Sequence, residues 1–212
     1  MSPKKELLTV EQVLEKYIPQ KAVIPVCCLL RDADIFLKIV SPRKTLHGSF
    51  RPSQLAHQKH LITVNNDLNP YTFLITLLHE IAHAHAWINH KAKGHQKEWK
   101  FCFKQLLNHF IELDIFPADI QTALKMHTQK IKYSDITDIN LTKTLQFYDE
   151  KPAAISNLIP LNEIPKNTVF SHNRKIFCKG EVLRKYILCK NLNNNKMYRC
   201  HPLMMVDVAK TP

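Results

Sequence analysis

The chain lacks any apolar run long enough to cross a membrane. Its longest largely apolar stretch, residues 22–30, contains Pro25 and is much shorter than the roughly 20 residues that a spanning helix needs. The first residues also lack the apolar core of a secretory signal. We therefore expect a cytoplasmic protein with no membrane partner.

Paired cysteines are also missing. No two of the six cysteines have the two-residue spacing of common zinc motifs, and a reducing compartment would keep them as thiols. The three in the first half of the chain are most simply small core residues. Cys178, Cys189 and Cys200 have histidines nearby in the sequence, so a second zinc site remains an alternative to plain packing.

Acidic residues are scarce at the C-terminal end. Residues 151–212 carry 11 Lys+Arg against 3 Asp+Glu, whereas residues 1–150 carry 19 against 15, and the whole chain has a net charge of +12. Such a field favours a polyanionic partner, and DNA or another nucleic acid is the commonest one inside cells.

Aromatic residues alternate with the basic ones in this segment, a composition suited to phosphate contact and base stacking. A solvated face over an ordinary β core would have the same composition. The candidate nucleic-acid-binding residues are Arg174, Lys175, Lys179, Arg184, Lys185, Tyr186, Lys190, Lys196 and Arg199.

The strongest positive signal is a His-Glu-x-x-His pattern at residues 79–83. Asn69 is a candidate N-cap and Pro70 suits the first helical position, so a helix is predicted from there to about His90. On that helix His79 and His83 lie on one face, about 6 Å apart along the axis, and both can reach one metal ion. Apolar residues surround nearly the whole helix, which predicts that it is buried. Hydrogen-bonded core histidines are the alternative interpretation.

A third metal ligand has to come from outside this pair. His85 points across the helix, and His90 lies about 10 Å further along the axis. His95 follows Gly94, which permits a chain reversal, and is the best candidate. Glu98 is the next alternative, as a carboxylate ligand.

Three imidazoles bind Zn²⁺ and leave a fourth position for water, which is the open arrangement of catalytic zinc sites. Glu80 would then accept the proton of the water and pass it to the leaving nitrogen of an amide. The pattern therefore predicts peptide-bond hydrolysis. A peptide substrate could pair with an edge strand before the metal helix, and the candidate residues are Leu61, Ile62, Thr63, Val64 and Asn65.

We expect an α+β fold with a domain boundary near residue 150. Residues 1–150 would form the metal-binding domain, residues 151–166, which contain three prolines, a linker or strap, and residues 167–212 a small basic β module. Strands are predicted at 34–40, 45–50, 60–65, 175–179, 183–190, 196–199 and 203–208, and helices at 9–17, 69–90, from 95, from 117 and at 141–148.

Four segments resemble the SprT-like, Spartan-related family of zinc metallopeptidases. They are Ile62-Thr63-Val64-Asn65, Leu68-Asn69-Pro70-Tyr71, Leu77-Leu78-His79-Glu80-Ile81-Ala82-His83 and Gly94-His95-Gln96-Lys97-Glu98-Trp99-Lys100. The resemblance is strongest from about Thr45 to Phe103.

This resemblance implies a zincin-like domain in which a short β-sheet packs on a central metal-binding helix. It implies that His79, His83 and His95 bind zinc, that Glu80 is the catalytic acid/base, and that the substrates are proteins attached to DNA. Many members end in a zinc ribbon of paired cysteines, whereas the C-terminal segment here looks like the ribbon-less β module of some bacterial members.

A non-catalytic DNA-binding or regulatory protein with a structural zinc is the alternative function. The presence of Glu80 favours the enzyme, because a structural zinc site has no use for a carboxylate beside the metal.

Overall fold

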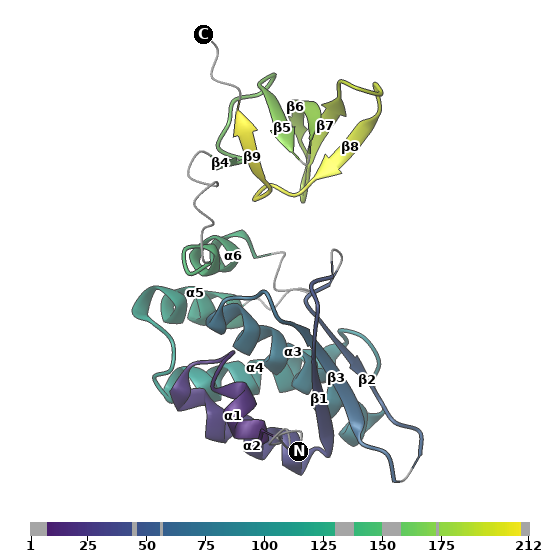
Figure 1. The fold of residues 1–212 in the computed structure, drawn as a ribbon, viewed down its shortest axis with the longest axis vertical. Helices are drawn as coiled ribbons and strands as arrows, with labels where there is room; N and C mark the ends of the chain where they lie inside the picture. Colours follow the sequence, from purple (N-terminus) through teal and green to yellow (C-terminus); the bar gives the residue numbers. More distant parts are fainter. Residues whose placement is uncertain are drawn as a thin grey trace, which may run out of the picture. The chain divides into compact units, whose positions relative to one another are not determined.

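The computed structural model describes residues 8–43, 46–55, 57–129, 138–149, 158–172 and 174–208. The chain divides into two compact units (Figure 1). One unit comprises Met1–Tyr133 with Thr144–Asp149, and the other comprises Ser134–Lys143 with Glu150–Pro212. The first contains a three-stranded sheet and most of the helices, and the second contains a six-stranded sheet. The predicted α+β class is confirmed.

The three-stranded sheet consists of β1 (Ile35–Val40), β2 (Gly48–Arg51) and β3 (His60–Asn65). Its order is β1-β3-β2, with β3 parallel to β1 and antiparallel to β2. The prediction that Leu61–Asn65 form an edge strand is therefore wrong. Strand β3 is inserted between the two earlier strands, so both of its sides are already paired and the edges belong to β1 and β2.

The two faces of this sheet differ in what covers them. Ile62 and Val64 of β3 are fully buried on the inner face, and β2 and β3 both contact helix α3 (Pro70–His90). Gly48 pairs with Val64, so it lies on the same inner face. Phe36 and Leu61 pair across β1 and β3 and lie on the outer face.

Helix α3 has the bounds that its sequence signals predict. The Asn69 side chain accepts hydrogen bonds from the backbone N–H groups of Tyr71 and Thr72, and Pro70 occupies the first helical position. Helices α4 (Lys97–Glu112) and α5 (Ala118–Gln129) follow, and α4 packs along α3. The largest fully buried side chains of this unit include Phe73 of α3 and Trp99 and Phe103 of α4.

The N-terminal helices are α1 (Val10–Leu14), the 3-10 turn η1 (Gln20–Ala22) and α2 (Val23–Asp32). Thr9 and Gln12 form a capping box at the start of α1. Helix α2 was not predicted, because Pro25 interrupts its apolar run. Pro25 is the third residue of α2, and the first four N–H groups of a helix have no partner within it, so proline removes no hydrogen bond there.

Helix α6 (Ile139–Gln146) precedes the second sheet along the chain. The sequence predicts this helix at 141–148, and the observed helix begins and ends two residues earlier. Within the first unit, Asn69 donates a hydrogen bond to the backbone oxygen of Leu145, and Tyr148 donates one to Asp119.

The second sheet is antiparallel in every pairing, with the order β4-β9-β5-β6-β7-β8. Its strands are β4 (Leu158–Pro160), β5 (Val169–His172), β6 (Lys175–Val182), β7 (Ile187–Asn191), β8 (Met197–Cys200) and β9 (Met205–Val208). The prediction of a linker at 151–166 is wrong for its second half. Residues 158–160 pair with β9, and Leu161 and Ile164 are buried, whereas residues 151–157 lie outside the described part.

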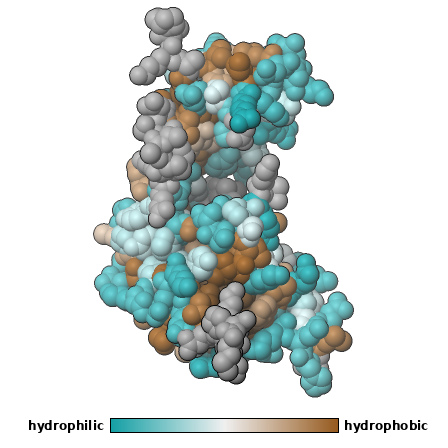
Figure 2. Space-filling view, in the orientation of Figure 1, coloured by the Kyte–Doolittle hydropathy of each residue, from teal (hydrophilic) through white to brown (hydrophobic). Residues whose placement is uncertain are grey.

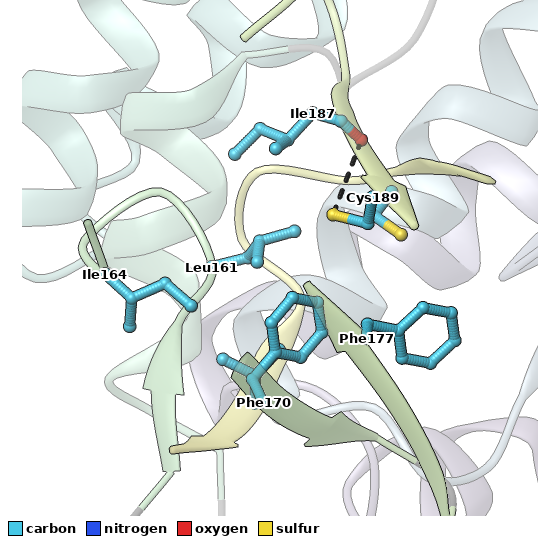
Figure 3. Packing of buried hydrophobic residues seen from close by; sticks show 8 residues of the cluster. Leu161, Ile164, Phe170, Phe177, Ile187 and Cys189 are labelled. Atoms are coloured by element: carbon cyan, nitrogen blue, oxygen red, sulfur yellow. Dashed lines mark hydrogen bonds between the residues drawn. The ribbon is translucent and has the colours of Figure 1, made fainter. Parts of the chain in front are cut away.

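The core of the second unit gathers on one side of this sheet (Figure 3). Phe170 and Phe177 stack with their ring centroids 5.5 Å apart, and Leu161, Ile187 and Cys189 surround them. A hairpin turn at 193–195 joins β7 to β8. The Asn191 side chain accepts hydrogen bonds from two backbone N–H groups in this turn, which fixes its shape.

Hydrophilic residues cover much of the face shown in Figure 2, and a band of hydrophobic residues crosses the first unit. Among the described residues, no helix combines the length and the apolar content that crossing a bilayer requires.

Candidate metal centre

His79 and His83 lie about one turn apart on α3, and Glu80 directly follows His79. The helix ends at Lys91, whose left-handed backbone (φ 53°) terminates the regular hydrogen-bond pattern. Gly94 has φ 66°, a conformation that glycine adopts without strain, and the chain then turns back toward α3. This reversal brings His95 to the two helical histidines.

The Nε2 atoms of the three histidines lie close together. His95 Nε2 lies 2.9 Å from His79 Nε2 and 3.2 Å from His83 Nε2. A tetrahedral zinc ion about 2.0–2.1 Å from each nitrogen would hold the nitrogens about 3.3 Å apart, so this donor set fits zinc after a slight expansion. Among the described residues, this is the only group of three His, Cys, Asp or Glu side chains close enough to share a metal ion.

Trp99 supports all three rings from helix α4. Its ring centroid lies 4.7 Å from that of His79, 5.3 Å from that of His83 and 4.4 Å from that of His95. Its Nε1 donates a hydrogen bond to the backbone oxygen of His79, and the residue is fully buried. From the sequence Trp99 is only an inward-facing residue at helical spacing. The signal that could have revealed its role is its position four residues after His95.

Glu80 lies on α3 between the two helical histidines in sequence and is almost fully buried, with 6% of its surface exposed. Edge strand β2 covers it. A Cβ atom added to Gly48 would lie 2.8 Å from Glu80 Oε1, so the backbone of β2 is in contact with this carboxylate. The structure thus places Glu80 at the junction of the metal helix and the edge strand β2.

The other candidate ligands lie elsewhere. Glu98 is not part of the three-residue cluster, and its Oε2 is a buried atom with no hydrogen-bond partner. His85 is partly buried, and this burial lowers its pKa because the charged imidazolium is poorly solvated there. His90 is exposed at the end of α3. The geometry therefore favours His95 over these alternatives.

The predicted nucleic-acid contacts fall into two groups. Eight are exposed, namely Arg174, Lys175, Arg184, Lys185, Tyr186, Lys190, Lys196 and Arg199. Lys179 is not available as a contact, because it is buried and its ammonium donates hydrogen bonds to the backbone oxygens of Asn162 and Ile164. Lys179 therefore fastens the 158–166 segment to β6.

The three C-terminal cysteines do not form a second three-ligand site. Cys189 and Cys200 are buried in the core of the second sheet, whereas Cys178 is only partly buried. The hydrogen bond with Cys200 and burial both raise the pKa of the Cys189 thiol. These thiols are packing residues, which was the simpler of the two interpretations.

One protein family matches part of the chain. No curated protein and no solved structure matches the chain. Residues 39–123 match the model of the SprT-like family, and this segment contains the three histidines, Glu80, Gly48 and Trp99. The match supports the assignment of this segment to the SprT-like family.

Proposed function

We propose that this protein is a zinc-dependent peptidase in which Glu80 is the general base. The observation that carries the proposal is the convergence of the three Nε2 atoms of His79, His83 and His95, with Glu80 directly after His79 on the same helix. Three neutral nitrogen ligands and an adjacent carboxylate are the set that catalytic zinc sites use. Membership of the SprT-like family supports a peptidase of this type.

When bound, zinc supplies a Lewis acid that polarises the scissile carbonyl and makes a water molecule acidic near neutral pH. Glu80 would act as the general base that takes a proton from the attacking water and would deliver that proton to the leaving nitrogen. Because Glu80 is enclosed by α3 and β2, its carboxylate is held in a fixed position. Trp99 holds the three imidazoles in position and limits the access of bulk water from the α4 side.

Strand β2 is the surface on which an extended peptide would bind. It pairs with β3 on one side, and within the described residues its other side has no strand partner. A peptide that paired with this edge would use main-chain hydrogen bonds and pass close to Glu80, since Gly48 of β2 contacts that residue. The proposed edge strand is thus β2, in place of β3.

Proteins bound or crosslinked to DNA are the proposed substrates. The chain has a net charge of +12, and the eight exposed residues Arg174, Lys175, Arg184, Lys185, Tyr186, Lys190, Lys196 and Arg199 supply charge and one aromatic ring for contact with DNA. A peptidase attached to DNA in this way would encounter DNA-bound proteins at a high local concentration.

The test compares three single variants of the full chain. Glu80→Gln should keep its zinc and lose at least about 100-fold in the rate of casein cleavage, because only proton transfer is removed. His79→Gln should lose both zinc and cleavage. His90→Gln, a matched control at the exposed end of the same helix, should lose neither. Metal content is measured by mass spectrometry, and cleavage is measured with and without DNA.

Retained turnover in Glu80→Gln would show that the assignment of the base is wrong. A zinc-loaded wild-type protein that cleaves no protein substrate, with or without DNA, would favour the non-catalytic alternative.

A further inference from the structure

The outer face of the β1-β3-β2 sheet carries a groove that the metal centre does not use. Its volume is about 380 Å³, at the small end of ligand-binding clefts. Phe36, Leu61 and Arg51 form one row of its floor, since Leu61 pairs with Phe36 on one side and with Arg51 on the other. Lys38 lies on the same face, two residues beyond Phe36.

Phe36 is the unusual residue of this floor. It lies on a strand of the sheet, yet 56% of its surface is exposed. This exposure leaves part of the apolar ring in contact with water, and a ligand that covered the ring would bury that surface. A flat ring that projects from an open sheet provides a platform on which another planar group can stack.

The charge around the ring is of one sign. Lys38, Arg51 and Lys59 line the groove, and none of its lining residues is acidic. Asp34 at the rim lies 3.6 Å from Lys59, but both side chains are more than 60% exposed, so solvent weakens this pair. The groove therefore attracts an anion beside an aromatic surface.

One wall of the groove is held in place before any ligand binds. Ser53 donates its backbone N–H to His60 Nδ1 at 2.9 Å, and the Ser53 hydroxyl donates to the backbone oxygen of Leu55. The His60 ring also contacts Phe50, with centroids 5.8 Å apart. Binding of a ligand therefore costs little conformational entropy at this wall.

We propose that this groove binds single-stranded nucleic acid, with a base stacked on Phe36 and the phosphates beside Lys38, Arg51 and Lys59. Duplex DNA fits poorly, because its bases are already stacked on each other and only its phosphates are accessible to this floor. An acidic protein partner fits poorly as well, because a stable protein interface involves about 20–30 residues on each side, whereas eight residues line this groove.

The inference goes beyond the proposed peptidase function. Helix α3 and Glu80 lie against the inner face of the sheet, whereas the groove is on the outer face. A bound strand would therefore leave β2's free edge and the metal centre open to a protein substrate. The inference is tested by binding alone, so a failure of the metal chemistry would not affect the result.

The experiment measures fluorescence anisotropy of a labelled oligodeoxythymidine of about 12 nucleotides, a length that such sites cover. The full-length protein is used, in a series of salt concentrations. Phe36→Ala should weaken binding about tenfold, because one stacked base is worth about 1–3 kcal/mol. Removing the charges in Lys38→Ala/Arg51→Ala should reduce the slope of log affinity against log salt by about 0.7 per cation.

The chain offers a matched control on α4, where Phe101 and Lys104 are both exposed and three residues apart. Phe101→Ala and Lys104→Ala should bind the oligonucleotide like the wild type. Phe36→Tyr should also bind normally because it keeps the ring face, whereas Phe36→Leu keeps an apolar side chain and should bind as poorly as Phe36→Ala. Circular dichroism confirms that each variant is folded.

Four results would overturn the proposal. They are no binding at low salt, equal losses in the Phe36 and Phe101 variants, full affinity in Phe36→Leu, and a preference for duplex over single strands. If charge removal at Arg184, Lys185 and Lys190 in the second unit abolishes binding while Phe36→Ala has no effect, the nucleic-acid site lies on the second unit and the groove assignment is wrong.

Discussion

Gly48 and Glu80 lie so close together that no side chain fits at position 48. A Cβ atom there would lie 2.8 Å from Glu80 Oε1, 2.9 Å from Glu80 Cγ and 2.8 Å from Thr76 Cγ2, all shorter than a normal van der Waals contact. The absence of a side chain at residue 48 lets the edge strand approach the carboxylate that we propose as the catalytic base.

Gly48→Ala should therefore reduce turnover without removing zinc. The new methyl group displaces Glu80, and a loss of about 1.4 kcal/mol in transition-state stabilisation gives a tenfold lower rate. The overpacking should also cost about 1–3 kcal/mol of unfolding free energy. Casein cleavage, zinc content and urea unfolding measure the three effects. Ser49→Ala, on the opposite face of the same strand, is the control, and wild-type turnover in Gly48→Ala would contradict the assignment.

Arg43 fixes the start of β2 and should affect substrate binding. Its guanidinium donates hydrogen bonds to Asn65 Oδ1 at 2.9 Å, to Thr63 Oγ1 at 2.9 Å and to the backbone oxygen of His47 at 3.3 Å. Lysine cannot reproduce this three-way contact. Arg43→Lys should lower kcat/KM for casein more than the control Arg31→Lys, which changes an exposed side chain. Equal kinetics in both variants would show that this contact does not position β2.

Trp99→Phe should weaken zinc binding while the fold is kept. Phenylalanine retains most of the apolar contact but loses the hydrogen bond to the backbone oxygen of His79 and part of the surface against the three imidazoles. Loss of a group that orients metal ligands typically reduces metal affinity by about 10–100-fold. Competition with a chromogenic chelator measures this affinity. Phe103 stacks on Trp99 and provides the comparison. Phe103→Leu should reduce the zinc affinity less than Trp99→Phe does.

Removal of zinc should lower the stability of the first unit. A ligand at 100 times its Kd stabilises the folded state by about 2.7 kcal/mol, so a chelator should lower the melting temperature of the wild type. Acidification should have the same effect, because protons compete with zinc for the imidazole nitrogens. His79→Gln should be insensitive to the chelator. A melting temperature that does not respond to the chelator in the wild type would show that this site binds no zinc.

Lys179→Met should destabilise the second unit and leave nucleic-acid binding intact. The variant removes both hydrogen bonds that the buried ammonium gives to the 158–166 segment, and each lost buried partner costs about 1–3 kcal/mol. Lys190→Met changes an exposed lysine that directly follows Cys189 on β7 and should alter stability by less than about 0.5 kcal/mol. Thermal unfolding and limited proteolysis compare the two. Equal stabilities would contradict the structural role of Lys179.

Local signals predicted the metal helix well. Asn69 and Pro70 set the start of α3, and the four-residue spacing of His79 and His83 placed both rings on one face. These features depend on residues within one or two turns of each other, so the sequence shows them directly. The strand at His60–Asn65 was also predicted with the bounds that the structure has.

Features that depend on distant residues were harder to predict. The order β1-β3-β2 depends on which strands pair with each other, and the sequence carries no signal for that choice. The edge strand was therefore assigned to β3 instead of β2. The short strands β4 and β5 were missed, because their residues show no clear alternation of apolar and polar side chains. Lys179 was taken for a surface charge, because its partners are backbone oxygens that no side-chain pattern reveals.

The sequence by itself determined the helix that carries His79, Glu80 and His83, and it singled out His95, because capping, spacing and a preceding glycine act over short distances. Only the tertiary structure decided that the three rings converge beside Trp99, that β2 covers Glu80 through Gly48, and that Phe36 stands on an open basic face. Those relationships depend on how α4 packs on α3 and how three strands pair, and nonlocal packing of this kind has no signature in any single segment.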